Sequence, residues 1–124
     1  MTTAAAFLAC LLLGAFTVFQ ALLACRLPLG RFAWGGQYDV LPARLRVGSV
    51  LAIAVYLVFG WVIAARAGLL GADNGVVRAM TWAIAGYFFL GAGANLASRS
   101  RPERVLMTPL AVALCGLTAA VAAR

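Results

Sequence analysis

The sequence predicts an all-α transmembrane bundle of four helices, which forms a single domain over residues 1–124. Hydrophobic residues make up 65% of the chain and charged residues only 10%, whereas a soluble domain carries about 25% charged residues. The chain also contains four apolar runs, and each is close to the 20 or so residues that a helix needs to cross a bilayer. Every arginine lies near or beyond the end of a run, which is where an insertion penalty of about 2.5–3.5 kcal/mol at the membrane centre would place it.

The four expected spans cover residues 3–25, 46–66, 76–98 and 104–123. The first run lacks the basic segment and the short apolar stretch of a signal peptide, so we expect it to remain as a helix. Its last letters, "LLAC", loosely resemble a lipoprotein cleavage box, but the arginines that follow oppose export. Small residues recur every four positions in the second span, from Gly48 through Gly60 to Gly68, and this spacing predicts close helix packing.

The connection after the first span is polar and rich in turn residues. Pro28 and Gly30 end the first helix, and Pro42 suits the first turn of the second. Residues 31–46 also contain several large apolar side chains, including Trp34, which disordered linkers lack. We therefore expect this loop to be ordered, to pack on the end of the bundle, and to use its adjacent glycines for a backbone turn.

The remaining connections carry helix-capping signals. Asp73 or Asn74 can cap the third span, and the loop between the second and third spans shows no other functional signal. Ser100 and Glu103 have the spacing of an S-x-x-E capping box at the start of the fourth span. Pro109 lies inside that span and is expected to bend it.

The distribution of arginine predicts the orientation of the chain. Seven arginines lie in the first and third loops, against three on the opposite side. Positive charge is retained in the cytoplasm, so both termini are predicted to lie outside the cytoplasmic membrane of a bacterium. Anionic lipid headgroups are the expected partners of the arginine-rich face.

The two cytoplasmic loops supply the candidate binding residues, which are Trp34, Gln37, Tyr38, Asp39, Arg44, Asn95, Arg99, Glu103 and Arg104. They could form a site for a ligand or partner. Alternatively, they hold the loops to the bundle and bind phospholipid headgroups. Because carboxylates are scarce beside lipid, we expect Asp39 or Glu103 to pair with an arginine of the other loop. We also expect Tyr38, Asp39 and Arg44 to contact the third span and third loop, and Gln20 to partner Asn95.

Several functional classes are disfavoured. The chain has no histidine, its spans contain no acid, and its three cysteines form no motif, so we expect no enzyme activity, no metal site and no cofactor. No basic helix stands apart from the spans, which argues against nucleic acid as a partner.

Two segments together carry a family resemblance. The pattern "AWGG....LPARLRVGS" and the later pattern "N..SRS.PER....P" resemble a group of uncharacterised small four-span membrane proteins of high-GC bacteria. The resemblance spans most of the chain but implies no chemistry. The matching residues are Trp34, Gly35, Gly36, Pro42, Arg44, Asn95, Ser98, Arg99, Glu103 and Arg104.

Two functional hypotheses follow. The first is a non-catalytic membrane protein that serves as an accessory or assembly subunit, or that binds lipid or a partner within a larger complex. The second is a small homo-oligomeric channel or transporter for a neutral or anionic solute. Its polar seam would comprise Thr17, Gln20, Asn95 and Thr118.

Overall fold

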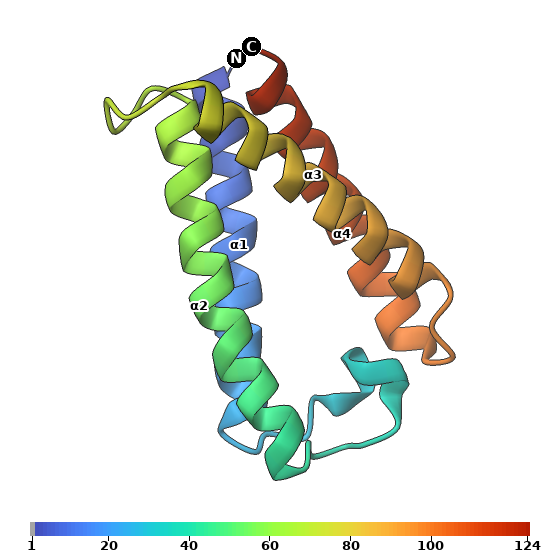
Figure 1. Cartoon of the computed structure of the whole chain (residues 1–124). Helices are drawn as coiled ribbons and strands as arrows, with labels where there is room; N and C mark the ends of the chain where they lie inside the picture. Colours follow the sequence, from blue (N-terminus) through green and yellow to red (C-terminus); the bar gives the residue numbers. More distant parts are fainter. Residues whose placement is uncertain (1) are drawn as a thin grey trace.

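The computed structural model describes residues 2–124, which form four long helices and, within that range, no strand (Figure 1). The helices are α1 (Thr2–Ala24), α2 (Ala43–Arg66), α3 (Gly75–Leu96) and α4 (Arg101–Ala123). Two short 3-10 turns, η1 (Gly30–Phe32) and η2 (Trp34–Gly36), lie between α1 and α2. All four helices are long and apolar enough to cross a membrane, so the predicted fold class is confirmed.

The helices form two hairpins arranged as a fork. α1 packs along α2, and α3 packs along α4 (Figure 1). The hairpins meet at the end that holds both termini and the α2–α3 connection, which we call the joined end. They separate toward the end that holds the α1–α2 and α3–α4 connections, which we call the open end. The expected tight bundle is therefore tight only at the joined end.

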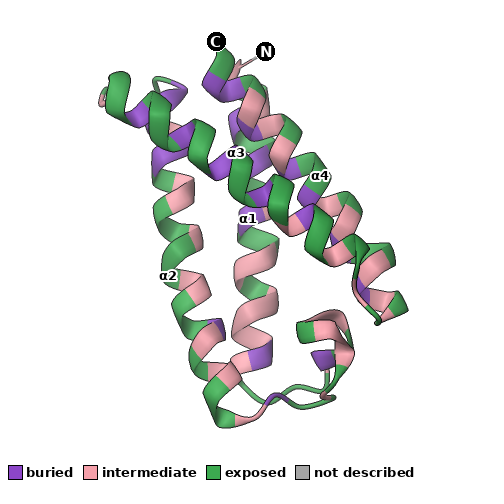
Figure 2. Ribbon diagram, turned by 45° about the vertical axis from the view of Figure 1, so that its right-hand side comes forward, coloured by how far each residue is buried: buried purple, intermediate pink, exposed green. Residues whose placement is uncertain are grey.

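Side-chain size accounts for the fork. At the joined end α1 presents Ala6 and Ala9, which are fully buried against the other helices. Farther from the joined end, Phe59 of α2 lies edge-on to Phe88 of α3 between the two hairpins, with ring centroids 5.8 Å apart. Small side chains let helices approach closely and large rings hold them apart, so the hairpins diverge where the aromatic residues begin. The buried positions of α1 and α2 lie mainly at the joined end (Figure 2).

Most helical glycines are not required by the space around them. A Cβ atom added to Gly60, Gly86, Gly93 or Gly116 would meet no neighbouring atom within 4 Å. The α1–α2 contact nevertheless passes Gly60, whose carbonyl lies 3.9 Å from the thiol of Cys10, and buried alanines such as Ala6 and Ala9 make the closest packing at the joined end.

The helix ends follow the capping rules. Asn74 caps α3, since its side-chain oxygen accepts the N–H of Val77 at 2.9 Å. Pro42 precedes the first residue of α2, and Ser100 caps α4. α4 remains helical through Pro109 as far as Ala123.

Candidate functional site at the open end

The α1–α2 connection is an ordered loop that extends from the α1–α2 hairpin toward the first turn of α4 (Figure 1). The loop folds back on itself at Gly30, whose N–H donates to the carbonyl of Asp39 at 2.9 Å. A Cβ at Gly30 would lie 1.8 Å from the carbonyl oxygen of Tyr38, so only glycine fits there. Leu41 and Gly30 are buried, so part of the loop is packed away from the surface.

The adjacent glycines bring the loop against α4. Gly35 and Gly36 have φ angles of 69° and 73°, which is the left-handed region that favours glycine. A Cβ at Gly36 would lie 2.6 Å from the Cβ of Ser100, whereas one at Gly35 would meet nothing within 4 Å. Gly36 is therefore required both for its backbone angle and for the contact with α4.

Glu103 fastens the loop to α4. Only 8% of this residue is exposed. Its Oε2 atom accepts the N–H of Gly35 at 2.9 Å and the hydroxyl of Ser98 at 3.0 Å. The hydroxyl of Ser100 donates to the carbonyl of Arg31 and accepts the N–H of Glu103. These hydrogen bonds therefore join the α1–α2 connection, the α3–α4 connection and the first turn of α4.

The predicted capping box is present in a modified form. Ser100 accepts the backbone N–H of Glu103 at 3.5 Å, as the motif requires. The reciprocal bond is replaced, because the N–H of Ser100 donates to the hydroxyl of Ser98 at 3.1 Å. Ser98 in turn donates to Glu103. By taking the place of the carboxylate at the helix N-terminus, Ser98 leaves Glu103 free to bind the loop.

The expected ion pair between the two loops does not form. Within residues 2–124, the ion pairs closer than 4.0 Å both involve Asp73, at the joined end. The buried carboxylate of Glu103 is satisfied by a backbone amide and a hydroxyl instead of an arginine. A positive φ at Gly35 turns its N–H toward α4, which supplies the donor that an arginine was expected to provide.

The other candidate residues are only partly brought together. Tyr38 of the loop accepts a hydrogen bond at 3.1 Å from Arg44 in the first turn of α2. Within residues 2–124 neither side chain hydrogen-bonds to α3 or to the α3–α4 connection, so the polar contacts expected there are not made. Arg104 donates to the carbonyl of Ser98 at 3.0 Å. Trp34 is 53% exposed beside Gly48. The remaining candidates are Gln37, Asp39 and Arg99, which are exposed, and Asn95, which is half-buried.

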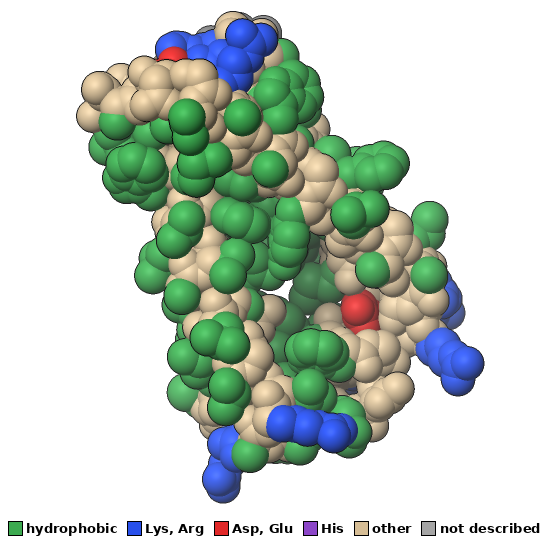
Figure 3. Space-filling view, viewed as in Figure 1, with side chains coloured by type: hydrophobic (Ala, Val, Ile, Leu, Met, Phe, Trp, Pro, Cys, Tyr) green, Lys and Arg blue, Asp and Glu red, His purple; other side chains and the backbone are tan. Residues whose placement is uncertain are grey.

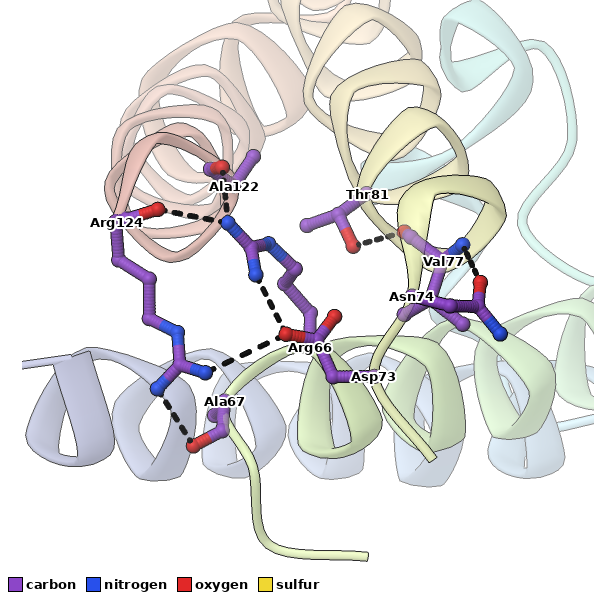
Figure 4. A network of polar contacts seen from close by, with 8 residues as sticks. All are labelled: Arg66, Ala67, Asp73, Asn74, Val77, Thr81, Ala122 and Arg124. Carbon is purple, nitrogen blue, oxygen red and sulfur yellow. Dashed lines mark hydrogen bonds and ion pairs between the residues drawn. The ribbon is translucent and has the colours of Figure 1, made fainter. Parts of the chain in front are cut away.

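The most connected polar network lies at the joined end, where the sequence indicated no function (Figure 4). Arg66 is 6% exposed, and its guanidinium donates to Asp73 at 2.7 Å. It also donates to the main-chain oxygens of Ala122 at 3.1 Å and Arg124 at 2.8 Å. Arg124 reaches Asp73 at 3.4 Å as well. One arginine therefore ties the end of α2 to the α2–α3 connection and to the end of α4.

A sequence signal for this network existed. Asp73 is the only acid between the second and third spans, and the scarcity of carboxylates that suggested a pair for Glu103 applied equally there. An arginine in the last turn of a helix is also well placed to bind free carbonyl groups. The network is an element of stability, because both terminal nitrogens of the Arg66 guanidinium donate to fixed partners of the chain, whereas its buried Nε has no partner among the described residues.

The two ends differ in how many carboxylates accompany their arginines. The open end has seven arginines and two carboxylates, whereas the joined end has three arginines and one carboxylate. Of the two open-end carboxylates, Glu103 is buried and engaged by the loop. The arginines that are exposed there are Arg26, Arg31, Arg44, Arg99 and Arg101. Figure 3 shows basic side chains gathered at both ends, with hydrophobic side chains covering the helices between them.

Comparison with protein-family models, with curated proteins and with solved structures gave no match to the chain. Among residues 2–124, no three His, Cys, Asp or Glu side chains lie close enough together to hold a metal ion. The arrangement at the open end offers hydrogen-bond donors and positive charge to a negatively charged partner.

Replacing Gly36 tests the packing of the loop. We expect Gly36→Val to destabilise the protein by more than the roughly 1–2 kcal/mol that a left-handed angle costs a residue with a Cβ, because the side chain would also overlap Ser100. Gly35→Val is the matched control, since it has the same backbone angle but open space. Thermal unfolding in detergent measures the difference. Equal losses for the two variants would contradict the packed contact.

Replacing Arg66 tests the network at the joined end. We expect Arg66→Gln to cost about 3–5 kcal/mol, because Asp73 and two carbonyl groups lose a buried partner. Arg66→Lys should recover only part of this loss, since an ammonium group cannot reproduce the planar set of donors. Arg78→Gln is the control, because Arg78 is exposed near the same end. If equilibrium unfolding gives Arg66→Gln and Arg78→Gln the same free energy of unfolding, the role assigned to Arg66 is refuted.

Proposed function

We propose that the chain is a non-catalytic integral membrane protein whose open end binds anionic phospholipid headgroups, so that it acts as a lipid-binding accessory module of a membrane assembly. The observation that supports this proposal most strongly is the set of exposed, uncompensated arginines at that end. In this proposal the open end faces the cytoplasm of a bacterium, in agreement with the arginine distribution. The same orientation leaves both termini outside.

The geometry favours hydrogen-bonded binding of a lipid phosphate over general electrostatic attraction to an anionic membrane surface. The loop is held in one conformation by Gly30, Gly36 and Glu103, and the backbone of Arg31 lies against Ser100, which is flanked by Arg99 and Arg101 at the start of α4. A guanidinium binds a phosphate through two parallel hydrogen bonds. Each basic residue near an anionic membrane surface contributes about 1 kcal/mol. Several arginines on an ordered loop can therefore distinguish anionic from zwitterionic lipid.

A polar pore receives little support from the same structure. Thr118 is fully buried within one copy of the chain, and Thr17 donates to the carbonyl of Leu13 in its own helix at 2.8 Å. Gln20 on α1 and Asn95 on α3 form no hydrogen bond with each other within the described residues 2–124. The four polar residues that could have lined a seam between subunits therefore have different environments, and we do not propose a channel.

Lipid-dependent stability tests the proposal. We expect phosphatidylglycerol to raise the melting temperature of the purified protein more than phosphatidylcholine does, by several degrees at low ionic strength, and high salt to reduce the difference. The double variant Arg99→Gln and Arg101→Gln should lose most of this gain, because both side chains are exposed at the open end. Arg78→Gln, at the joined end, is the matched control and should keep it. Equal stabilisation by the two lipids, or equal losses in the two variants, would contradict the proposal.

A further inference from the structure

Arg46, at the open end, is a half-buried arginine without a hydrogen-bond partner. Its Nε atom is buried, and no acceptor lies within hydrogen-bond distance of it. Within residues 2–124 its two terminal nitrogens form no hydrogen bond or ion pair either, and they are not enclosed. All five N–H groups of this guanidinium therefore lack an acceptor from the chain.

The other arginines that are not exposed have acceptors. Arg66 donates to Asp73 and to two main-chain oxygens, and Arg104 donates to the carbonyl of Ser98 at 3.0 Å. Of the three arginines that the fold removes from the surface wholly or in part, Arg46 alone has no acceptor among residues 2–124. A half-buried cation without an acceptor is destabilising, because it loses hydration and gains no hydrogen bond. An acceptor that comes from outside the chain removes this cost.

Arg46 lies where the surface of α2 changes from protein contact to lipid contact. It is the fourth residue of α2, so it is about 5 Å along the helix axis from the first. Residues three and four positions later are its neighbours on the helix surface. Of these, Ser49 is 1% exposed and Val50 is 56% exposed. The guanidinium therefore has packed protein on one side and lipid on the other, near the membrane surface.

The local charges favour an anion as the acceptor. The first turn of α2 contains Arg44 but no acidic residue, and Pro42 provides no side-chain cap. The N-terminus of a helix is the positive end of its dipole. Asp39 is the nearest acid in the sequence, but it is exposed and forms no ion pair within residues 2–124. The positive potential around Arg46 is therefore not offset by a carboxylate of the chain.

We propose that Arg46 binds the phosphate diester of an anionic phospholipid. This inference rests on the proposed function and identifies the residue that hydrogen-bonds the phosphate. The two terminal nitrogens present parallel N–H groups to the phosphate oxygens. The acyl chains of the same lipid lie against Val47 and Val50, which are exposed on α2. The exposed arginines supply an attraction that salt screens, whereas the contact with Arg46 is partly buried and is screened much less.

Thermal unfolding of the purified protein, with and without phosphatidylglycerol, separates binding from a structural role. Without lipid, we expect Arg46→Met to unfold at the same temperature as the original protein or higher, because the change removes an unpaired charge and keeps an apolar stem. With phosphatidylglycerol at high ionic strength, which screens the exposed arginines, the order should reverse. The apparent affinity for this lipid should fall about tenfold or more, as expected for the loss of a charge-assisted hydrogen bond.

Three comparisons complete the experiment. Arg78→Met, at the joined end, is the matched control and should bind phosphatidylglycerol as the original protein does. Arg46→Lys should recover only part of the affinity, because an ammonium group lacks the planar pair of donors. Inorganic phosphate offers the same oxygens without acyl chains, and it should not replace the lipid.

The contradicting outcomes concern the partner, the residue and the ligand. If Arg46→Met unfolds at a lower temperature without lipid, or does not fold, Arg46 has a partner within the chain, and equal destabilisation by Asp39→Asn would identify it. The proposal is also overturned if Arg46→Met binds phosphatidylglycerol at high ionic strength as the original protein does. Equal stabilisation by inorganic phosphate or phosphatidylcholine overturns the choice of ligand. If the Arg99 and Arg101 double variant still loses the stabilisation at low ionic strength, headgroup binding stands and only the role of Arg46 is refuted.

Discussion

The open end of the molecule depends on one buried carboxylate. Glu103 lies in the first turn of α4 and accepts the backbone N–H of Gly35 from the α1–α2 connection, so it joins the two arms of the fork where they are farthest apart. A hydrogen bond to a charged acceptor contributes about 1.5–3 kcal/mol, and a buried carboxylate without a donor costs more than that. The glycine angles, the modified capping box and the ordered arginines all follow from satisfying this one group.

Each end of the fork contains one buried charged side chain that contacts an end of α4, and the two side chains have opposite charge. At the joined end a buried cation, Arg66, is satisfied by a carboxylate and by free carbonyls at the end of α4. At the open end a buried anion, Glu103, is satisfied by an amide and a hydroxyl at the start of α4. In both places the chain uses the unpaired backbone groups of helix ends or turns, because the apolar spans leave few polar side chains available. The consequence is that the arginines of the open end have no ion pair within the described residues 2–124.

Much of this structure could be predicted from the sequence, where hydropathy and capping act locally. The four helices, the cap at Asn74 and the ordered loop with its glycine turn all follow from residue type and spacing. The fork could not be predicted, because it depends on which alanines and which aromatic rings face each other across helices. The partner of Glu103 could not be predicted either, because it is a backbone N–H, and residue type does not show which backbone N–H will be the donor. The Arg66 network was predictable in principle and was missed because Asp73 was interpreted only as a turn and capping residue.

The most direct measurement of the central claim is the distance between the two arms at the open end. Spin labels placed at Ala43, at the start of α2, and at Arg101, at the start of α4, can be measured by pulsed electron resonance in lipid nanodiscs. The account predicts one narrow distance distribution for the original protein and a markedly broader one for Glu103→Ala, with labels at the joined end unchanged. A distribution that is equally narrow with and without the Glu103 carboxylate would show that this contact does not hold the open end together.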